Sequence, residues 1–295
     1  MMKRMAKKTL LVYNPEARSV TEKKVERVVS VLRKESSLVD VVRSERRGHI
    51  KEVGREVSRD GGVDVLVVFG GDGSLNEAVN GVVGDSLRIA FVPGGTSNVI
   101  RHELRIPSSP ERAAHVAVRG IPTPVLPGLA GGRRFLLMAG VGVDAEIVRS
   151  VHPARKKFLG KAEYIITGAG VYFRKKREFS VHQGGKHLGP FCWAVFARSS
   201  YYAGPFRVVK EARLSDPLIR AYLFRPAGGL KFVEYTLRTV LGLPYGKGDC
   251  VRVEGEGFTV TSEEPVPYQV DGDEAGTTPF TISLEKTPLV LVRGV

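Results

Sequence analysis

Cysteine is scarce in this 295-residue chain, which contains only Cys192 and Cys250. Two cysteines so far apart cannot form a disulfide framework, and they lack the paired spacing of a zinc site. The six histidines are scattered without the spacing of metal ligands. Composition therefore argues against a disulfide-stapled secreted domain and against a zinc protein.

Long hydrophobic runs are also missing, and none approaches the length of a membrane-spanning helix. The basic residues 1–8 lead directly into a short apolar run and lack the long apolar core of a signal peptide. We therefore expect a cytoplasmic protein that is soluble or touches a membrane surface. Hydrophobic residues make up 42% of the chain, which is enough for one large or two medium domains with real cores.

Acidic residues are outnumbered, with 31 Asp and Glu against 45 Lys and Arg, for a net charge of +14. Such a field attracts nucleotides, nucleic acid or anionic lipid headgroups. We expect no nucleic-acid partner, because the charge is spread out and no aromatic stacking platform is recognisable. Basic clusters at 155–157 and 174–177 flank an apolar stretch, 164–173. That segment fits either a helix lying on a membrane surface or an ordinary packed helix with solvated ends.

The first part of the chain alternates strand-like and helix-like patterns. Apolar runs typical of buried strands occupy residues 9–13, 38–42, 65–69 and 89–92. Helical patterns occupy residues 21–34, 50–58 and 110–118. This alternation predicts an α/β fold with a doubly wound parallel sheet, whose ligands bind at the carboxyl ends of the strands.

After residues 121–124 strand-like segments dominate, with helical stretches only near 161–173 and 230–241. We expect a first domain over residues 1–124 and a second, mostly antiparallel β domain over residues 125–285. The last apolar run, 288–292, either returns to the first domain, which residues 286–295 would then complete, or closes the second.

Two glycine-rich turns follow neighbouring apolar strands. Residues 70–74 read Gly-Gly-Asp-Gly-Ser, and residues 93–98 read Pro-Gly-Gly-Thr-Ser-Asn. Glycine lets backbone N–H groups approach a ligand closely, and a helix N-terminus behind the turn favours an anion. Together the two turns predict a phosphate-binding floor at one sheet edge. Neither turn is a Walker A loop or a dinucleotide fingerprint.

The first turn contains two residues with specific expectations. Ser74 and Glu77 have the spacing of a capping box, so Ser74 is expected to cap the following helix. Asp72 is unusual, since a carboxylate repels phosphate unless a cation intervenes or a backbone donor holds it. A shared Mg²⁺ resolves the conflict; an aspartate chosen for turn geometry is the alternative.

These motifs resemble the catalytic domain of diacylglycerol kinases, in particular the stand-alone bacterial lipid kinases. The resemblance continues through Asn14-Pro15, residues 140–145 (Gly-Val-Gly-Val-Asp-Ala) and residues 270–273 (Val-Asp-Gly-Asp), and it spans nearly the whole chain. It implies a nucleotide-binding first domain, a β-sandwich second domain for the lipid, and an active site in the cleft between them. The residues that it assigns to ATP are Asn14, Ser44, Gly70, Gly71, Asp72, Gly73, Ser74, Leu75, Asn76, Gly94, Gly95 and Thr96.

The resemblance also implies catalytic acids. Asp271 and Asp273 occupy the position of the family's Asp-Gly-Glu, whose last acid is the general base, and Asp72 bridges Mg²⁺ to the phosphates. A carboxylate base suits a lipid hydroxyl, which is a poor nucleophile until it loses its proton. From these residues alone a hairpin turn is favoured, because Asp-Gly is a common two-residue loop.

A structural Mg²⁺ is implied as well, held by the Asp216 carboxylate and the carbonyls of Arg213 and Leu218. A simple Asp-Pro surface turn is the alternative for this segment. The sequence departs from the family at residues 16–18, at Pro217, and at Asp273, which is one methylene shorter than glutamate. A displacement of roughly 1 Å can cost on the order of 10²-fold in rate unless Glu274 serves instead.

The sequence thus predicts an ATP- and Mg²⁺-dependent lipid kinase that acts on a lipid hydroxyl, such as that of diacylglycerol, at the inner face of the membrane. Two alternatives stay open. One is a regulator that binds nucleotide or lipid without efficient chemistry, and the other is an NAD kinase, which shares the first motif. The oligomeric state is also open, with a homodimer among the options.

Overall fold

The computed structural model describes residues 8–150, 170–174, 176–202, 206–241, 243–246 and 248–295. The chain divides into two compact units, one formed by residues 1–127 and 285–295 and the other by residues 128–284. We call them the N-unit and the β-unit. The basic cluster at 155–157 and most of the helix expected over 161–173 lie outside the described residues.

The N-unit is built on one six-stranded sheet with the order β2-β1-β3-β4-β20-β5. Its first five strands in this order are parallel, and only β5 runs antiparallel to its neighbour β20. The strands are β1 (Lys8–Tyr13), β2 (Leu38–Arg43), β3 (Val65–Gly70), β4 (Arg88–Pro93), β5 (Ile121–Val125) and β20 (Leu289–Arg293). Every residue of β3 is buried, as a central parallel strand covered on both faces requires.

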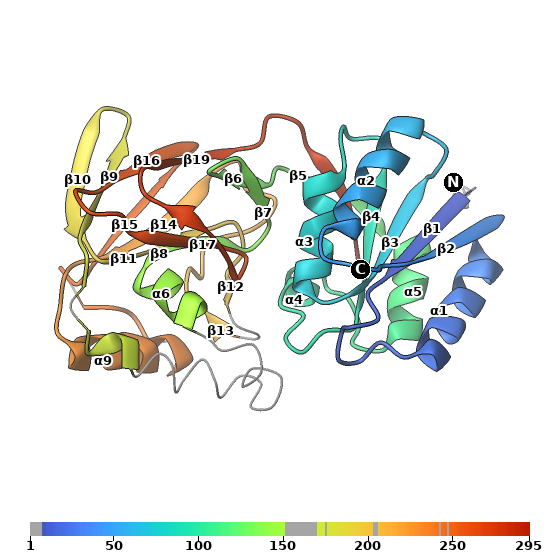
Figure 1. Ribbon diagram of the computed structural model, residues 1–295, viewed down its shortest axis with the longest axis horizontal. Coiled ribbons are helices and arrows are strands. Elements are labelled where there is room, and N and C mark those ends of the chain that lie inside the picture. Colours follow the sequence, from blue (N-terminus) through green and yellow to red (C-terminus); the bar gives the residue numbers. More distant parts are fainter. Residues whose placement is uncertain (1–7, 151–169, 175, 203–205, 242, 247) are drawn as a thin grey trace. The chain divides into compact units, whose positions relative to one another are not determined.

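Helices cover both faces of this sheet (Figure 1), so the predicted doubly wound α/β fold is confirmed. Helices α1 and α5 contact each other, and α2 and α3 contact each other. Amphipathic spacing explains α1, whose Val25, Val28 and Leu32 are buried after an N-cap by Thr21. The helices are α1 (Glu22–Glu35), α2 (His49–Asp60), α3 (Asp72–Gly81), α4 (Ile100–Glu103) and α5 (Pro110–Arg119).

The β-unit contains two six-stranded antiparallel sheets, as predicted for a mostly antiparallel second domain. The first has the order β10-β9-β16-β19-β6-β7 and the second β15-β14-β11-β8-β17-β18. The first comprises β6 (Gly128–Ala130), β7 (Arg133–Phe135), β9 (Phe179–Gln183), β10 (Lys186–Phe191), β16 (Gly257–Thr261) and β19 (Phe280–Leu284). The second comprises β8 (Met138–Gly142), β11 (Trp193–Ala197), β14 (Ile219–Phe224), β15 (Cys250–Gly255), β17 (Pro267–Val270) and β18 (Asp273–Thr277).

Side chains of both sheets form one hydrophobic core, which includes Phe135, Phe179 and Phe258 of the first and Val141 and Phe196 of the second. This is the packing of a β-sandwich. The remaining described elements are α6 (Val143–Ser150), α9 (Gly229–Leu241) and the short pair β12 (Tyr201–Tyr202) and β13 (Phe206–Arg207). Among the described residues, no helix has the length and hydropathy needed to cross a membrane.

The last apolar run returns to the first unit. As β20 it lies between β4, with which it pairs in parallel, and β5, with which it pairs antiparallel. Segment 121–124, after which the sequence pattern changes, begins strand β5 despite its two prolines. Proline is tolerated there because β5 is an edge strand, where one side of the backbone needs no partner.

Candidate functional site

The two glycine-rich turns lie side by side at one sheet edge, as the sequence predicts. Strands β3 and β4 pair in parallel with Gly70 opposite Pro93, and the Gly94 amide donates to the Gly70 carbonyl at 2.7 Å. Asn14 follows β1, and its amide donates to the Phe69 carbonyl at 3.0 Å. The order β2-β1-β3 reverses the direction of winding between β1 and β3, which is where doubly wound sheets bind ligands.

Backbone approaches backbone where the two turns meet. A Cβ on Gly95 would lie 2.6 Å from the Gly71 Cα, closer than real Cβ atoms come to any atom. A Cβ on Gly70 would lie 2.5 Å from the Ser74 Oγ. Glycine is therefore required here by close packing. At this edge of the sheet the backbones of Gly71 and Gly95 fill the space that side chains would take if other residues stood there.

Helix α3 begins three residues earlier than the capping box predicts, so the prediction that Ser74 caps the helix is wrong. The N-cap is Gly71, in extended conformation and without a side-chain cap. Ser74 lies in the first turn, and its Oγ accepts a hydrogen bond from Asn14 Nδ2 at 3.2 Å. First-turn amides such as those of Gly73 and Ser74 have no acceptor within the helix. They are suited to an anionic ligand.

The Asp72 carboxylate is held by backbone donors. Its two oxygens accept hydrogen bonds from the amides of Val99, at 2.9 Å, and Ile100, at 3.1 Å. Burial raises the pKa of this carboxyl, and the two amide bonds oppose that rise. The sequence leaves two ways for a carboxylate to be accommodated in a phosphate-binding turn, a bridging cation or a backbone donor. In this structure backbone donors hold Asp72. Asp72 thereby fastens the first turn to the segment after the second.

Asn98 closes the second turn on itself. Its Oδ1 accepts the Gly95 amide at 2.9 Å, and its Nδ2 donates to the Gly95 carbonyl at 2.8 Å. Asn98 has a positive φ of 45°, a conformation that asparagine tolerates better than most residues. This locks Gly95 beside Gly71 and leaves Thr96 exposed. Asn98 belongs to the second glycine-rich motif, but the motif alone predicts no role for it.

The other residues assigned to ATP fall into two groups. Ser44 follows β2, where its amide donates to the Tyr13 carbonyl at 2.9 Å, so it stands at the same sheet edge as Asn14. Leu75 and Asn76 are buried within the N-unit. The Asn76 Oδ1 accepts from Asn80 Nδ2 at 3.1 Å. The residues predicted to contact the nucleotide therefore lie in one region of the N-unit, and Leu75 and Asn76 are buried beneath its surface.

Asp271 lies in the turn from β17 to β18, and Asp273 is the first residue of β18. Asp271 has a φ of 50°, and its carboxylate accepts the amides of Leu136, Leu137 and Met138, each at 2.9 Å. That arrangement fixes the turn to the segment before β8. Asp271 therefore has a clear structural task, in addition to the catalytic one that the resemblance implies.

Asp273, the predicted base, is paired with a cation. Arg133 Nη2 donates to Asp273 Oδ2 at 2.7 Å, and the Asp273 side chain is 41% exposed. The alternative base, Glu274, lies 3.5 Å from Arg149 Nε. Both acids thus lie at the start of β18, with an arginine beside each. Neither arginine is identifiable from sequence spacing, because Arg133 and Asp273 are 140 residues apart.

A buried acid that the sequence analysis leaves without a role lies behind this turn. The Asp144 carboxylate accepts from the Tyr202 hydroxyl and from Gln269 Nε2, the latter at 2.6 Å. Gln269 Oε1 in turn accepts the Gly272 amide at 2.7 Å. Burial raises the pKa of Asp144, and the hydrogen bonds from Tyr202 and Gln269 oppose the rise. Gln269 thereby connects Asp144 to the turn that contains Asp271 and leads into Asp273.

Replacing Asp144 with asparagine is expected to flatten the pH dependence of stability. Because burial raises the pKa of Asp144, the folded chain keeps this proton at pH values where the unfolded chain has released it. Stability therefore falls as the pH rises from about 4, the ordinary pKa of aspartate, toward the raised value. Asparagine removes that fall. Melting temperatures between pH 4.5 and 8 measure it, with Asp85→Asn as an exposed control that keeps Asp144. An unchanged fall in Asp144→Asn would contradict the assignment.

The residues expected to hold a structural Mg²⁺ do not fit that ion. Arg220 pairs with the Asp216 carboxylate and also approaches Glu254 at 3.3 Å. The fully buried Arg198 donates to the carbonyls of Leu218, at 2.5 Å, and Leu214, at 2.8 Å. Two guanidinium groups thus occupy the oxygens that a cation would use, and they would repel a dication. The Arg213 carbonyl accepts the Asp216 amide at 3.1 Å.

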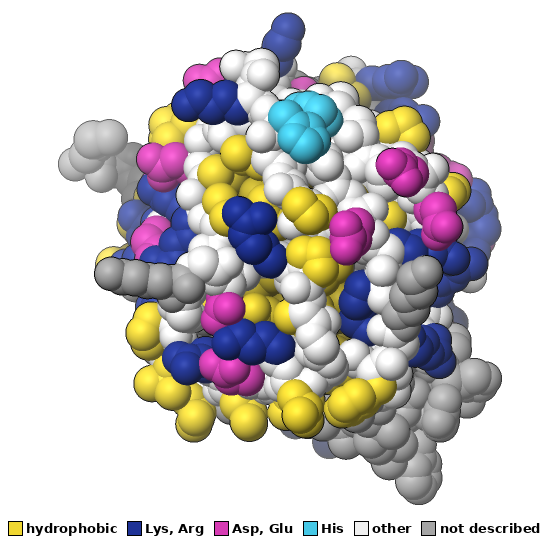
Figure 2. All heavy atoms as spheres, turned by 90° about the vertical axis from the view of Figure 1, so that its left-hand side faces the viewer, with side chains coloured by type: hydrophobic (Ala, Val, Ile, Leu, Met, Phe, Trp, Pro, Cys, Tyr) yellow, Lys and Arg dark blue, Asp and Glu magenta, His cyan; other side chains and the backbone are white. Residues whose placement is uncertain are grey.

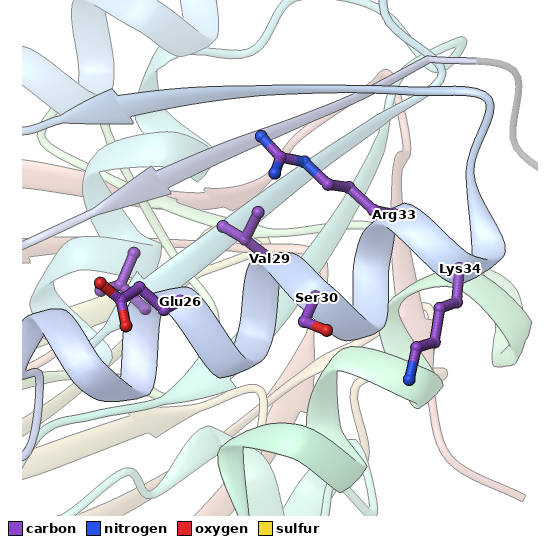
Figure 3. A pocket seen from close by; sticks show the side chains of 6 residues that line it. Glu26, Val29, Ser30, Arg33 and Lys34 are labelled. Atoms are coloured by element: carbon purple, nitrogen blue, oxygen red, sulfur yellow. The ribbon is translucent and has the colours of Figure 1, made fainter.

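A surface hollow on helix α1 lies apart from these residues. Val25, Glu26, Val29, Ser30, Arg33 and Lys34 line it, all from one helix (Figure 3). It contains none of the residues that the sequence analysis singled out. We assign it no part in the site.

Comparison with known proteins supports the resemblance drawn from the motifs. The family model described as diacylglycerol kinase catalytic domain matches residues 8–129. The protein named "Diacylglycerol kinase" from Staphylococcus carnosus is 24% identical over 286 residues, which cover 93% of this chain and 91% of that protein. A protein from Pseudomonas putida named "Probable lipid kinase YegS-like" is 29% identical over 217 residues, covering 72% of this chain and 71% of its own length.

Solved structures show the same fold. A crystal structure of a diacylglycerol kinase from Bacillus anthracis superposes with a TM-score of 0.79 at 19% identity, covering 99% of this chain and 98% of the other. A second structure from the same strain gives a TM-score of 0.85 at 21% identity over 99% of both chains.

Proposed function

Because the family model described as diacylglycerol kinase catalytic domain matches residues 8–129, we propose that this chain is a lipid kinase of that family. It would transfer the γ-phosphoryl group of ATP, with Mg²⁺, to a hydroxyl group of a membrane lipid such as diacylglycerol. The names of its relatives from Staphylococcus carnosus and Pseudomonas putida support this substrate class. A lipid substrate also requires the protein to meet a membrane, which we propose it does as a peripheral protein on the cytoplasmic face.

One observation carries the proposal: the backbone contact between Gly71 and Gly95 at the carboxyl ends of two adjacent parallel strands. Main-chain amides in the first turn of α3, which have no acceptor within the helix, match the oxygens of a triphosphate. The net charge of +14 adds a long-range attraction for the same anion. The donors present therefore fit a nucleotide.

Mg²⁺ fits as an ion that is bound largely by the phosphates. This ion keeps several waters and often uses only one or two protein carboxylates beside substrate phosphates. Asp72 is the acid of the glycine turns, and two backbone amides already hold it. Bound with ATP, Mg²⁺ would neutralise charge on the phosphoryl group in transfer. The protein's own contribution is the fixed position of the turns.

The β-unit would supply the base. Arg133 orients the Asp273 carboxylate, which we propose accepts the proton of the lipid hydroxyl. Asp271, bonded to three amides, holds the turn that leads into Asp273. Asp273 is one methylene shorter than the glutamate that the family has at this position. The backbone beside it is held in place by the three hydrogen bonds to Asp271.

Incubating the full chain with labelled ATP, Mg²⁺ and vesicles that contain diacylglycerol is expected to give labelled phosphatidic acid. Asp273→Asn removes the proposed base and is expected to lower the rate by at least about 10²-fold, the usual scale for general base catalysis. ATP binding should be retained, because the variant leaves the N-unit unchanged. Thin-layer separation of the labelled lipids measures the rate, and a nucleotide titration measures binding.

Asp85→Asn is the matched control, since Asp85 is exposed in the N-unit and belongs to none of the assigned sites. A total lipid extract and NAD serve as additional acceptors. Labelled NAD without labelled lipid would replace the proposal with NAD kinase activity. ATP binding without turnover on any lipid would indicate a regulator. Wild-type turnover by Asp273→Asn would exclude its role as base.

A further inference from the structure

Helix α9 (Gly229–Leu241) of the β-unit has a hydrophobic outer face. Leu230, Leu237 and Leu241 are 78%, 55% and 67% exposed. Their spacings of seven and four residues place them on one side of the helix, because two helical turns take about seven residues. We call these three leucines the outer face of α9. Exposed leucines in single file are unusual for a helix that is already packed on one side.

The opposite side of α9 is anchored in the β-unit. Phe232 and Tyr235 are buried there, with their ring centroids 6.3 and 6.4 Å from that of Trp193. Phe224 stacks on Trp193 at 4.3 Å and completes an aromatic cluster. This cluster fixes the rotation of the helix. The outer face is therefore directed away from the core by packing.

The apolar surface continues onto the segment 170–174. Tyr172 stacks on Phe232 with a centroid distance of 6.0 Å, and its hydroxyl lies 2.5 Å from Thr236 Oγ1. The next residue, Phe173, is 66% exposed, and its ring lies against the position of Gly229 at the start of α9. Hydrophobic side chains gather along the lower edge of the face shown in Figure 2, where α9 lies.

Charge beside this surface is positive. The charged residues of α9 are largely compensated, since Lys231 and Arg238 pair with Glu234, and Lys231 also pairs with Asp249 at 2.8 Å. The adjoining residues 174–177 read Arg-Lys-Lys-Arg and contain no acid. Arg174 is exposed directly beside Phe173. Within this run Arg177 pairs with Glu264 at 3.7 Å, so the exposed Arg174 is the cation that directly flanks the apolar face. An apolar face with a basic flank is complementary to a surface that is anionic outside and apolar within.

We propose that the outer face of α9, together with Phe173 and Arg174, docks the protein on an anionic lipid bilayer. The leucines and Phe173 would enter the boundary between headgroups and acyl chains, and the basic flank would lie among the headgroups. This inference deepens the proposed lipid kinase function and rests on it for the nature of the partner. A second copy of the chain suits the surface less well, because pairing would bring two basic flanks together.

Co-sedimentation of the full chain with phosphatidylcholine vesicles, with and without phosphatidylglycerol, tests the proposal. The double variant L237S/L241S is expected to bind both kinds of vesicle at least about tenfold more weakly, because it removes two apolar side chains from the contact. Arg174→Gln is expected to weaken binding about fivefold, and only where phosphatidylglycerol is present. Val83→Ser, which removes a 52% exposed valine from the N-unit, is the matched control and should bind as wild type.

Thermal melting checks that each variant is folded, and the rate on vesicle-borne diacylglycerol separates the two proposals. Loss of vesicle binding by L237S/L241S supports the docking surface even if no lipid is phosphorylated by the wild type, in which case only the kinase proposal fails. Wild-type vesicle binding and wild-type rates in L237S/L241S overturn the docking surface and leave the kinase intact. A dimer that becomes a monomer in L237S/L241S, with vesicle binding unchanged, also overturns it in favour of a second copy.

Discussion

Replacing Gly95 with alanine is expected to weaken ATP binding by at least about 100-fold, or roughly 2.7 kcal/mol. The added Cβ would lie 2.6 Å from the Gly71 Cα and 2.9 Å from Asn98 Oδ1. Both neighbours are fixed, because Gly71 caps α3 and Asn98 bonds to Gly95 twice. The two turns must therefore move apart, and the amides that we assign to the triphosphate separate with them. A nucleotide titration of the full chain measures the loss.

Gly62→Ala is the matched control, since a Cβ there has no atom within 4 Å and the residue does not have a positive φ. Gly71→Ala is a milder test of the same contact, because its Cβ would lie 3.4 Å from the Gly95 Cα. The assignment predicts binding in the order wild type, Gly71→Ala, Gly95→Ala. Wild-type affinity in a folded Gly95→Ala protein would show that ATP binds elsewhere.

Replacing Arg198 with methionine is expected to destabilise the protein by about 3 kcal/mol and to lower its melting temperature by roughly 10 °C. Methionine keeps much of the length of the side chain but removes the donors to the carbonyls of Leu214 and Leu218. Those carbonyls are then left in the interior of the β-unit without their charged partner. Thermal unfolding followed by circular dichroism measures the change.

Arg213→Met is the control for the same substitution on the same segment, because Arg213 is exposed and its effect should be small. The role of Arg198 also predicts how the protein responds to metal. With no nucleotide present, EDTA and Mg²⁺ should leave the melting temperature of the wild type unchanged. A fall in EDTA would mean that the structural cation is present after all, alongside the two arginines.

The fold could be predicted from the sequence because its signals are local. The run Val65–Gly70 is continuously apolar, and a strand buried on both faces is what such a run favours. The position of the glycine turns could be predicted for the same reason. Each turn directly follows a parallel strand, so both turns lie at the edge formed by the carboxyl ends of the strands. The sequence could not predict which unit residues 288–292 join. An apolar run indicates a buried strand, but it does not indicate which sheet the strand pairs with.

The detailed site could be predicted less well, because its contacts join residues far apart in the chain. The capping box failed at Ser74 because Gly71 adopts the extended N-cap conformation three residues earlier. The partners of Asp72 are amides 27 and 28 residues away, and amides carry no sequence signal. The hydrogen bond from Arg198 to the Leu218 carbonyl could not be predicted, because nothing in the sequence distinguishes a buried arginine from an exposed one.

The position of β20 has a consequence for how the polypeptide is made. This strand comes from residues 289–293, yet it lies between β4 and β5 inside the sheet of the N-unit. When only residues up to 127 have emerged from the ribosome, β20 has not yet been made. Strands β4 and β5 then lack the strand that lies between them in the finished sheet. The sandwich of residues 128–284 is translated whole before that gap is filled. Synthesis thus completes residues 128–284 first, and the sheet of the unit that we assign to ATP closes only after residues 289–293 have been made.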